Sequence, residues 1–241
     1  MKAVERHRLK ENELSHVLSG ATARFSESRR TVGLAVAAVV LVLAAAGGYW
    51  AWKTRTETRA QLLLGDAIAI VQAPVEEPKP GAKPAAASYP TIRARAEAAL
   101  GKFTDVFNRY PSTKAGIAAR YYAASALTML GRPAEAATRY QEVVDRAGTD
   151  NFYGRVAQLG IVEANAQAKQ YDQAISAAQA LVNNTADETM PRDALLMELG
   201  RVQATAGKKA EAKQTFDKVI AEFPESPYIE EAKTLLASVT S

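Results

Sequence analysis

The chain has 241 residues and no cysteine, which excludes disulfides, thiol nucleophiles and zinc–thiolate sites. Its net charge of +4 belongs to the first part of the sequence, because residues 91–241 carry 18 Lys/Arg and 18 Asp/Glu. A neutral region of that length lacks the basic surface of a nucleic-acid binder, so we expect no nucleic-acid partner.

A basic tail, residues 1–30, precedes 22 residues without a charge, residues 31–52. A helix of that length is about 33 Å long, enough to cross a hydrocarbon core of roughly 30 Å. Tyr49, Trp50 and Trp52 lie at its C-terminal end, where aromatic side chains favour the membrane interface. Residues 31–52 are therefore predicted to form one transmembrane helix.

The orientation of this helix follows from its flanking charges. Seven basic residues precede it in 1–30 and five follow in 53–83, so the positive-inside rule favours a cytoplasmic tail and an extracytoplasmic C-terminal region. A cleaved signal peptide is the alternative, with Ala44-Ala45-Ala46 as a cleavage-like site. The long charged region before that site and the bulky Tyr49 after it argue against cleavage.

Three further regions follow the apolar run. Residues 53–73 have the pattern of a helix that leaves the membrane. Residues 74–90 contain five of the ten prolines and predict an extended linker. Residues 91–241 are rich in alanine and helical throughout, with Gly131 and Gly207 as helix stops, so we predict an all-α domain there.

Three segments of this domain superpose with a spacing of 38 residues. They read LGRPAEAATRYQEVVDRA (130–147), AKQYDQAISAAQALVNNT (168–185) and AGKKAEAKQTFDKVIAEF (206–223). A fixed period of helix pairs is typical of a solenoid, in which each repeat buries the apolar face of its neighbour. The small and aromatic positions that recur are predicted to be core: Ala136, Ala174, Ala212, Tyr140, Ala178 and Phe216.

These segments resemble the tetratricopeptide repeat. That family has Gly at the turn, Glu-Ala at the start of the second helix, an aromatic residue four positions on and Pro at the close. The third segment fits best, with Gly200, Gly207, Phe216 and Pro224, whereas the second has Lys169 in place of the turn glycine. The resemblance implies an α-solenoid of about three to four helix pairs plus a capping helix.

The layout of basic tail, single anchor, Pro-rich insertion in the first repeat and Ala-rich repeats resembles the YfgM-like family of ancillary Sec translocon subunits. The resemblance covers residues 24–223. It implies a single-pass protein of the bacterial inner membrane, with a cytoplasmic N-terminus and periplasmic repeats that contact translocon and chaperones. The motifs at 110–112 and 223–227 also resemble periplasmic repeat proteins that serve envelope division and outer-membrane assembly.

The sequence carries no recognisable catalytic motif, and His7 and His16 are nine positions apart, which does not suit metal ligation on one helix face. We predict no enzyme activity, no cofactor and no metal site. Repeat solenoids bind on their concave face, formed by the first helix of each pair. The family's register puts nine residues there: Tyr121, Ser125, Met129, Leu159, Glu163, Gln167, Met197, Arg201 and Thr205.

Two hypotheses about function follow. The first is a membrane-anchored scaffold whose repeats hold a protein partner outside the cytoplasm, as a link between the translocon and chaperones. The alternative is a structural accessory subunit of another large membrane complex, held through its transmembrane helix. Small residues of that helix, Gly33, Ala37, Gly47 and Gly48 among them, would let another helix pack closely.

Overall fold

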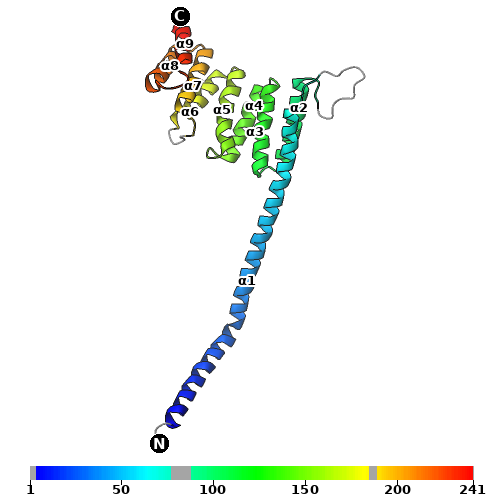
Figure 1. Ribbon diagram of the computed structural model, residues 1–241, viewed down its shortest axis with the longest axis vertical. Helices are drawn as coiled ribbons and strands as arrows, with labels where there is room; N and C mark the ends of the chain where they lie inside the picture. The colour runs from blue at the N-terminus through cyan, green and yellow to red at the C-terminus, as the bar shows by residue number, and fades with distance from the viewer. Residues whose placement is uncertain (1–3, 77–87, 185–188, 241) are drawn as a thin grey trace, which may run out of the picture. The chain divides into compact units, whose positions relative to one another are not determined.

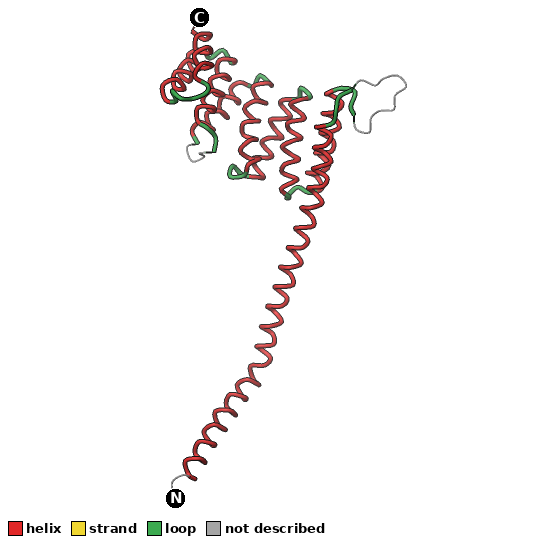
Figure 2. Tube along the Cα trace, viewed as in Figure 1, coloured by secondary structure: helices red, strands yellow, loops and turns green. Residues whose placement is uncertain are grey.

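The computed structural model describes residues 4–76, 88–184 and 189–240, and side chains from residue 31 onward except residue 32. Within those ranges the regular elements are helices joined by loops, with no strand (Figure 2). The chain divides into two compact units, Met1–Arg55 and Thr56–Ser241. The all-α fold class predicted from the sequence is confirmed.

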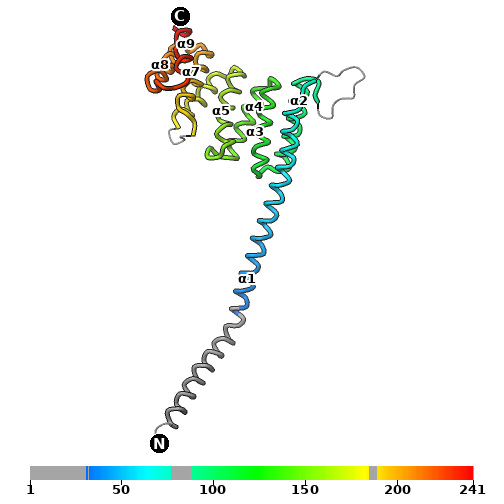
Figure 3. Tube along the Cα trace, in the orientation of Figure 1, coloured from blue at the N-terminus to red at the C-terminus, as the bar shows by residue number. Residues whose placement is uncertain are grey.

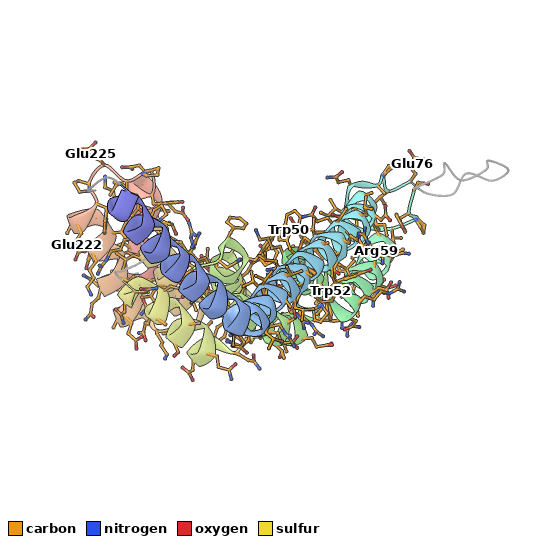
Figure 4. The ribbon with its side chains drawn as sticks, turned by 90° about the horizontal axis from the view of Figure 1, so that it is seen from below. Trp50, Trp52, Arg59, Glu76, Glu222 and Glu225 are labelled. Atoms are coloured by element: carbon orange, nitrogen blue, oxygen red, sulfur yellow. The ribbon has the colours of Figure 1, made fainter. Side chains whose placement is uncertain are left out.

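Helix α1, Val4–Gln72, contains the predicted apolar run. One stretch within it, Gly33–Gln72, is long and apolar enough to cross a membrane, and its most apolar window has mean hydropathy 2.1 and is unburied. Trp50 and Trp52 are 70% and 63% exposed and point to opposite sides of α1 (Figure 4). Aromatic side chains on opposite sides of a helix, at nearly the same height along its axis, are typical of the aromatic belt at a membrane interface.

The second unit is a series of helix pairs that follow one another in chain order (Figures 1 and 3). Consecutive helices pack side by side, so each pair contacts the next and builds a solenoid. After α1 the helices are α2 (Ile92–Arg109), α3 (Lys114–Met129), α4 (Pro133–Ala147), α5 (Phe152–Gln167), α6 (Tyr171–Asn183), α7 (Arg192–Thr205), α8 (Lys209–Glu222) and α9 (Ile229–Thr240).

The second compact unit begins at Thr56, within α1. Ala60 and Ala67 of α1 are fully buried, and Ala67 packs in one cluster with Phe103 and Phe107 of α2. The last part of α1 is therefore the first helix of the first pair. The sequence composition does not reveal this pairing of helices, because the Pro-rich segment separates α1 from α2 along the chain.

The ends of the Pro-rich segment are held together by backbone hydrogen bonds. The amide of Glu76 donates to the carbonyl of Tyr89 at 3.0 Å, and the amide of Tyr89 donates to the carbonyl of Pro74 at 3.0 Å. Most of the predicted linker, residues 77–87, lies outside the described residues. The described ends of the segment therefore lie side by side, between two helices that pack together.

A carboxylate of α1 joins α1 to the second pair. The two oxygens of Glu57 accept hydrogen bonds from the amides of Lys114 and Ala115, at 3.0 and 3.1 Å. These are the first amides of α3, which have no acceptor within their own helix. A negative charge there also favours the positive end of the helix dipole, so Glu57 fixes α1 against α3.

The 38-residue period recurs in the helix ends. Helices α3, α5 and α7 are followed by a residue with positive φ: Gly131 at 72°, Lys169 at 59° and Gly207 at 76°. At each, the amide of the next residue bonds to a carbonyl five positions back, at 2.8–2.9 Å. This left-handed turn closes a helix and favours glycine. The predicted stops at Gly131 and Gly207 are confirmed.

The recurring small and aromatic positions lie in the core, as predicted. Ala136, Ala174, Ala212 and Phe216 have no exposed surface, Ala178 is 2% exposed and Tyr140 is 6% exposed. The Phe216 ring packs on the backbone of Gly200, where an added Cβ would lie 2.4 Å from its Cε1 atom. Tyr140 packs on Gly160 in the same manner. Small residues therefore make room for the rings between helices.

Candidate partner-binding site

Three of the nine predicted concave residues line one groove. The groove lies between α5 and α7, beside Tyr228 at the start of α9, and has a volume of about 460 Å³. Leu159 and Glu163 come from α5 and Arg201 from α7. Its other lining residues are Met190, Pro191, Ala194, Leu195, Glu198 and Tyr228.

Arg201 is tied to α9 by a bidentate ion pair. Its Nη2 atom lies 2.8 and 2.9 Å from the two carboxylate oxygens of Glu231, and its Nε donates to Glu231 at 3.0 Å. A weaker contact of 3.4 Å joins its Nη1 to Glu198. Fork geometry of this kind is the strongest carboxylate contact an arginine makes. Arg201 thus holds α7 against α9 and has little charge to offer a ligand.

Glu163 faces the other side of the same groove. It is exposed, and its carboxylate accepts a hydrogen bond from the Nε2 atom of Gln167 at 3.0 Å. Gln167 is also exposed, and so is Thr205, whose hydroxyl donates to the carbonyl of Arg201 at 2.8 Å. These two predicted residues lie at the ends of α5 and α7 and do not line the groove.

A cluster of tyrosines lies on α3, α4 and α5. Tyr121 has its ring centroid 5.6 Å from that of Tyr122, 5.5 Å from Tyr140 and 5.6 Å from Tyr153. Burial raises the pKa of Tyr121, and the nearby Tyr122 and Glu163 raise that pKa further. Burial likewise raises the pKa of Tyr140 and of Tyr153 to about 12. These hydroxyls are therefore neutral hydrogen-bonding groups at neutral pH.

A second, smaller pocket lies beyond the tyrosines. It has a volume of about 40 Å³ and is bounded by α1, α2 and α3, with Ser125 and Met129 among its lining residues. Tyr122 belongs to both this pocket and the tyrosine cluster. The small pocket, the tyrosines and the groove occupy successive helix pairs of the solenoid, and together they make up the candidate face.

Met197, a predicted concave residue, lies in the core and lines neither pocket. It has no exposed surface and packs in the core cluster that includes Leu195, Phe216 and Ala232. The equivalent residues Tyr121 and Leu159 are only half-buried. The difference arises because α9 packs against the last pair and covers the Met197 position.

Two residues of the face were missed in the sequence. Tyr153 lies near the start of α5, and Tyr228 lies in the turn before α9. Neither occupies the repeat position that the family uses for its concave surface. Both residues reach the face through contacts between helices, which the repeat pattern does not show. The one sequence signal for them is an aromatic residue close to the start of a predicted helix. Within the described residues, no three acidic, histidine or cysteine side chains are grouped to hold a metal ion.

Comparison with known proteins identifies a repeat family and solved structures that are similar to this chain. The tetratricopeptide repeat family matches residues 118–148 and 193–226. Among solved structures, TPR-like repeats assigned to a kinesin light chain of Podosopora anserina share 17% identity and a TM-score of 0.56, covering 76% of this chain and 86% of theirs. A point variant of the same repeats gives 16% identity and a TM-score of 0.53, covering 76% and 94%.

No curated protein matches the sequence. The structural likeness, at this identity, concerns the fold alone. The two matched segments coincide with α3–α4 and α7–α8, the pairs whose helices are joined by the turns at Gly131 and Gly207. Repeats of this kind are scaffolds for protein–protein interaction. Two segments of the chain therefore match the tetratricopeptide repeat, and the helix pairs form an α-solenoid with the same fold as the TPR-like structures.

Proposed function

We propose that this protein is a membrane-anchored scaffold, with α1 as the anchor and the candidate face of the repeats as its binding surface. The observation that carries the proposal is that one chain contains two features. One is an unburied helix with the length and hydropathy of a membrane span. The other is a solenoid face with a groove of about 460 Å³, which lies within the range of ligand-binding clefts.

The partner we propose is the Sec translocon together with extracytoplasmic chaperones. The resemblance to the YfgM-like family supports this choice, as does the greater number of basic residues before the apolar run than after it. In this arrangement the N-terminal residues lie in the cytoplasm of a bacterium and the repeats lie in the periplasm. An anchored solenoid then keeps its binding face near the exit of the translocon.

Crosslinking in native membranes tests this proposal. Membranes that contain the full chain are treated with an amine-reactive crosslinker, extracted mildly and analysed by mass spectrometry. We expect crosslinks between residues 114–205 and translocon or chaperone subunits. Crosslinks confined to residues 1–55 would contradict the proposal, because they would leave the solenoid without a partner.

A second candidate is a structural subunit held through α1. Gly33, Gly47 and Gly48 have open space where a Cβ would lie, which favours close packing of another helix in a membrane. Replacing residues 31–52 by an unrelated apolar helix separates the two functions. A scaffold keeps its partner after the exchange, because the repeats are unchanged, whereas a helix-held subunit loses its complex.

A further inference from the structure

The groove between α5 and α7 has a surplus of negative charge. Glu163 and Glu198 line it directly, together with the single basic residue Arg201. Glu231, from α9, already forms a bidentate pair with Arg201. Counting these four side chains, three carboxylates share one guanidinium. Glu163 forms no ion pair within the described part of the chain, and Glu198 has only the 3.4 Å contact with Arg201.

Apolar and aromatic surface surrounds these charges. Leu159 and Met190 are half-buried and line the groove, and Leu195 forms part of its base. Tyr228 contributes an aromatic ring beside the carboxylates. A guanidinium or ammonium group gains both from carboxylates and from the face of an aromatic ring. An apolar side chain next to that cation gains from burial against the leucines and the methionine.

We infer that this groove binds a cationic and apolar segment of a protein partner, with an arginine or lysine side chain between Glu163 and Glu198 and an adjacent apolar side chain on Leu159. The inference rests on the proposed scaffold function and specifies the chemistry that the partner presents. An acidic segment is disfavoured at the groove, because the one arginine there is neutralised by Glu231. The Arg201–Glu231 ion pair holds α7 and α9 together at the side of the groove.

The test uses the full chain in nanodiscs of zwitterionic phosphatidylcholine, so that cationic peptides find no anionic lipid. Random peptides displayed on phage are selected on the wild-type protein, and the charge of the selected sequences is recorded. One selected peptide is then titrated against three proteins: the wild type, the double variant Glu163→Gln with Glu198→Gln, and a control. The control is Glu222→Gln with Glu225→Gln, which removes the same charge from two exposed residues at the end of α8 and in the turn after it (Figure 4).

We expect selected peptides to carry arginine or lysine beside an apolar residue. The groove variant should bind such a peptide roughly tenfold more weakly, since two partly exposed charge pairs are lost. The control should bind within about twofold of wild type, because its two carboxylates are exposed to solvent and do not line the groove. Added salt should weaken binding to the wild type more than binding to the groove variant.

Three results would overturn the inference: selection of acidic or uncharged peptides, equal weakening in both variants, or no selection at all. The crosslinking experiment on native membranes keeps this failure separate from failure of the scaffold function. If the repeats crosslink to a partner while acidic peptides are selected, the scaffold stands and the charge preference is wrong. If the repeats crosslink to nothing, the scaffold itself is wrong.

Discussion

Lys169 occupies a backbone conformation that glycine holds in the two equivalent repeats. Its φ is +59°, whereas Gly131 and Gly207 have φ of +72° and +76°. Its amide donates to the carbonyl of Ala166 at 3.0 Å, and the amide of Gln170 donates to the carbonyl of Asn165 at 2.8 Å. Those two hydrogen bonds define the left-handed closing turn of a helix. The second repeat therefore adopts the family's turn at the expense of backbone strain.

We predict that Lys169→Gly stabilises the repeat domain. Left-handed backbone costs a residue with a Cβ about 1–2 kcal/mol. The greater conformational freedom of glycine in the unfolded chain offsets roughly 0.5–1 kcal/mol of that gain. The free energy of unfolding should then rise by about 0.5–1 kcal/mol. For a domain of this size that gain raises Tm by about 1–4 °C. The Lys169 side chain is exposed, so its removal loses little packing.

The assay is urea unfolding of the full chain in mild detergent, followed by far-ultraviolet circular dichroism. The matched control is Lys218→Gly, which removes the same side chain from an exposed position in the interior of α8. Glycine there should destabilise by about 1 kcal/mol, because the helical backbone gains nothing from it. Equal destabilisation by both substitutions would refute the argument from backbone conformation.

Three further predictions concern capping, packing and pH. Glu57→Gln should lower the free energy of unfolding by about 0.5–1 kcal/mol, because the first two amides of α3 lose a charged acceptor, and amide exchange at the start of α3 should accelerate. Gly200→Ala should cost about 1–3 kcal/mol, since the new Cβ meets the buried ring of Phe216, whereas Gly101→Ala, with open space around it, should stabilise α2. Burial raises the pKa of Tyr153 to about 12, from the 10.0 of an exposed tyrosine, so its contribution to stability is complete below pH 10.0 and lost as the pH rises toward 12. Tm measured against pH should therefore fall over that range, and Tyr153→Phe should make the fall shallower. A decline just as steep in that variant would contradict the assignment.

Much of the solenoid could be predicted because its physical requirements recur every 38 residues. Close helix approach needs small residues such as Ala136 and Ala212, and the groove between pairs needs a ring such as Phe216. Such requirements depend on local position within a repeat, so the sequence displays them directly. The sequence also shows the replacement of the turn glycine by Lys169, but only the structure shows that the turn keeps its left-handed conformation there.

Other features depend on contacts between distant segments and were missed. The last part of α1 belongs to the first repeat, but the Pro-rich insertion breaks the period that would have shown it. Glu57 lies far from α3 in the sequence, so its capping role has no local signal. Met197 occupies a concave position in the family's register, yet the packing of α9 buries it. Tyr153 and Tyr228 were missed for the same reason, because contacts between separate helices place them in the site.

The most direct test of the central claim is site-specific photo-crosslinking in native membranes. A photo-crosslinking amino acid replaces Leu159 in the groove or, in a separate protein, the exposed Glu222 of α8. We predict that the Leu159 position crosslinks to one defined protein partner and that the Glu222 position does not. Equal crosslinking from both positions, or crosslinking from neither, would contradict the claim that the face between α5 and α7 is the surface by which this anchored solenoid holds its partner.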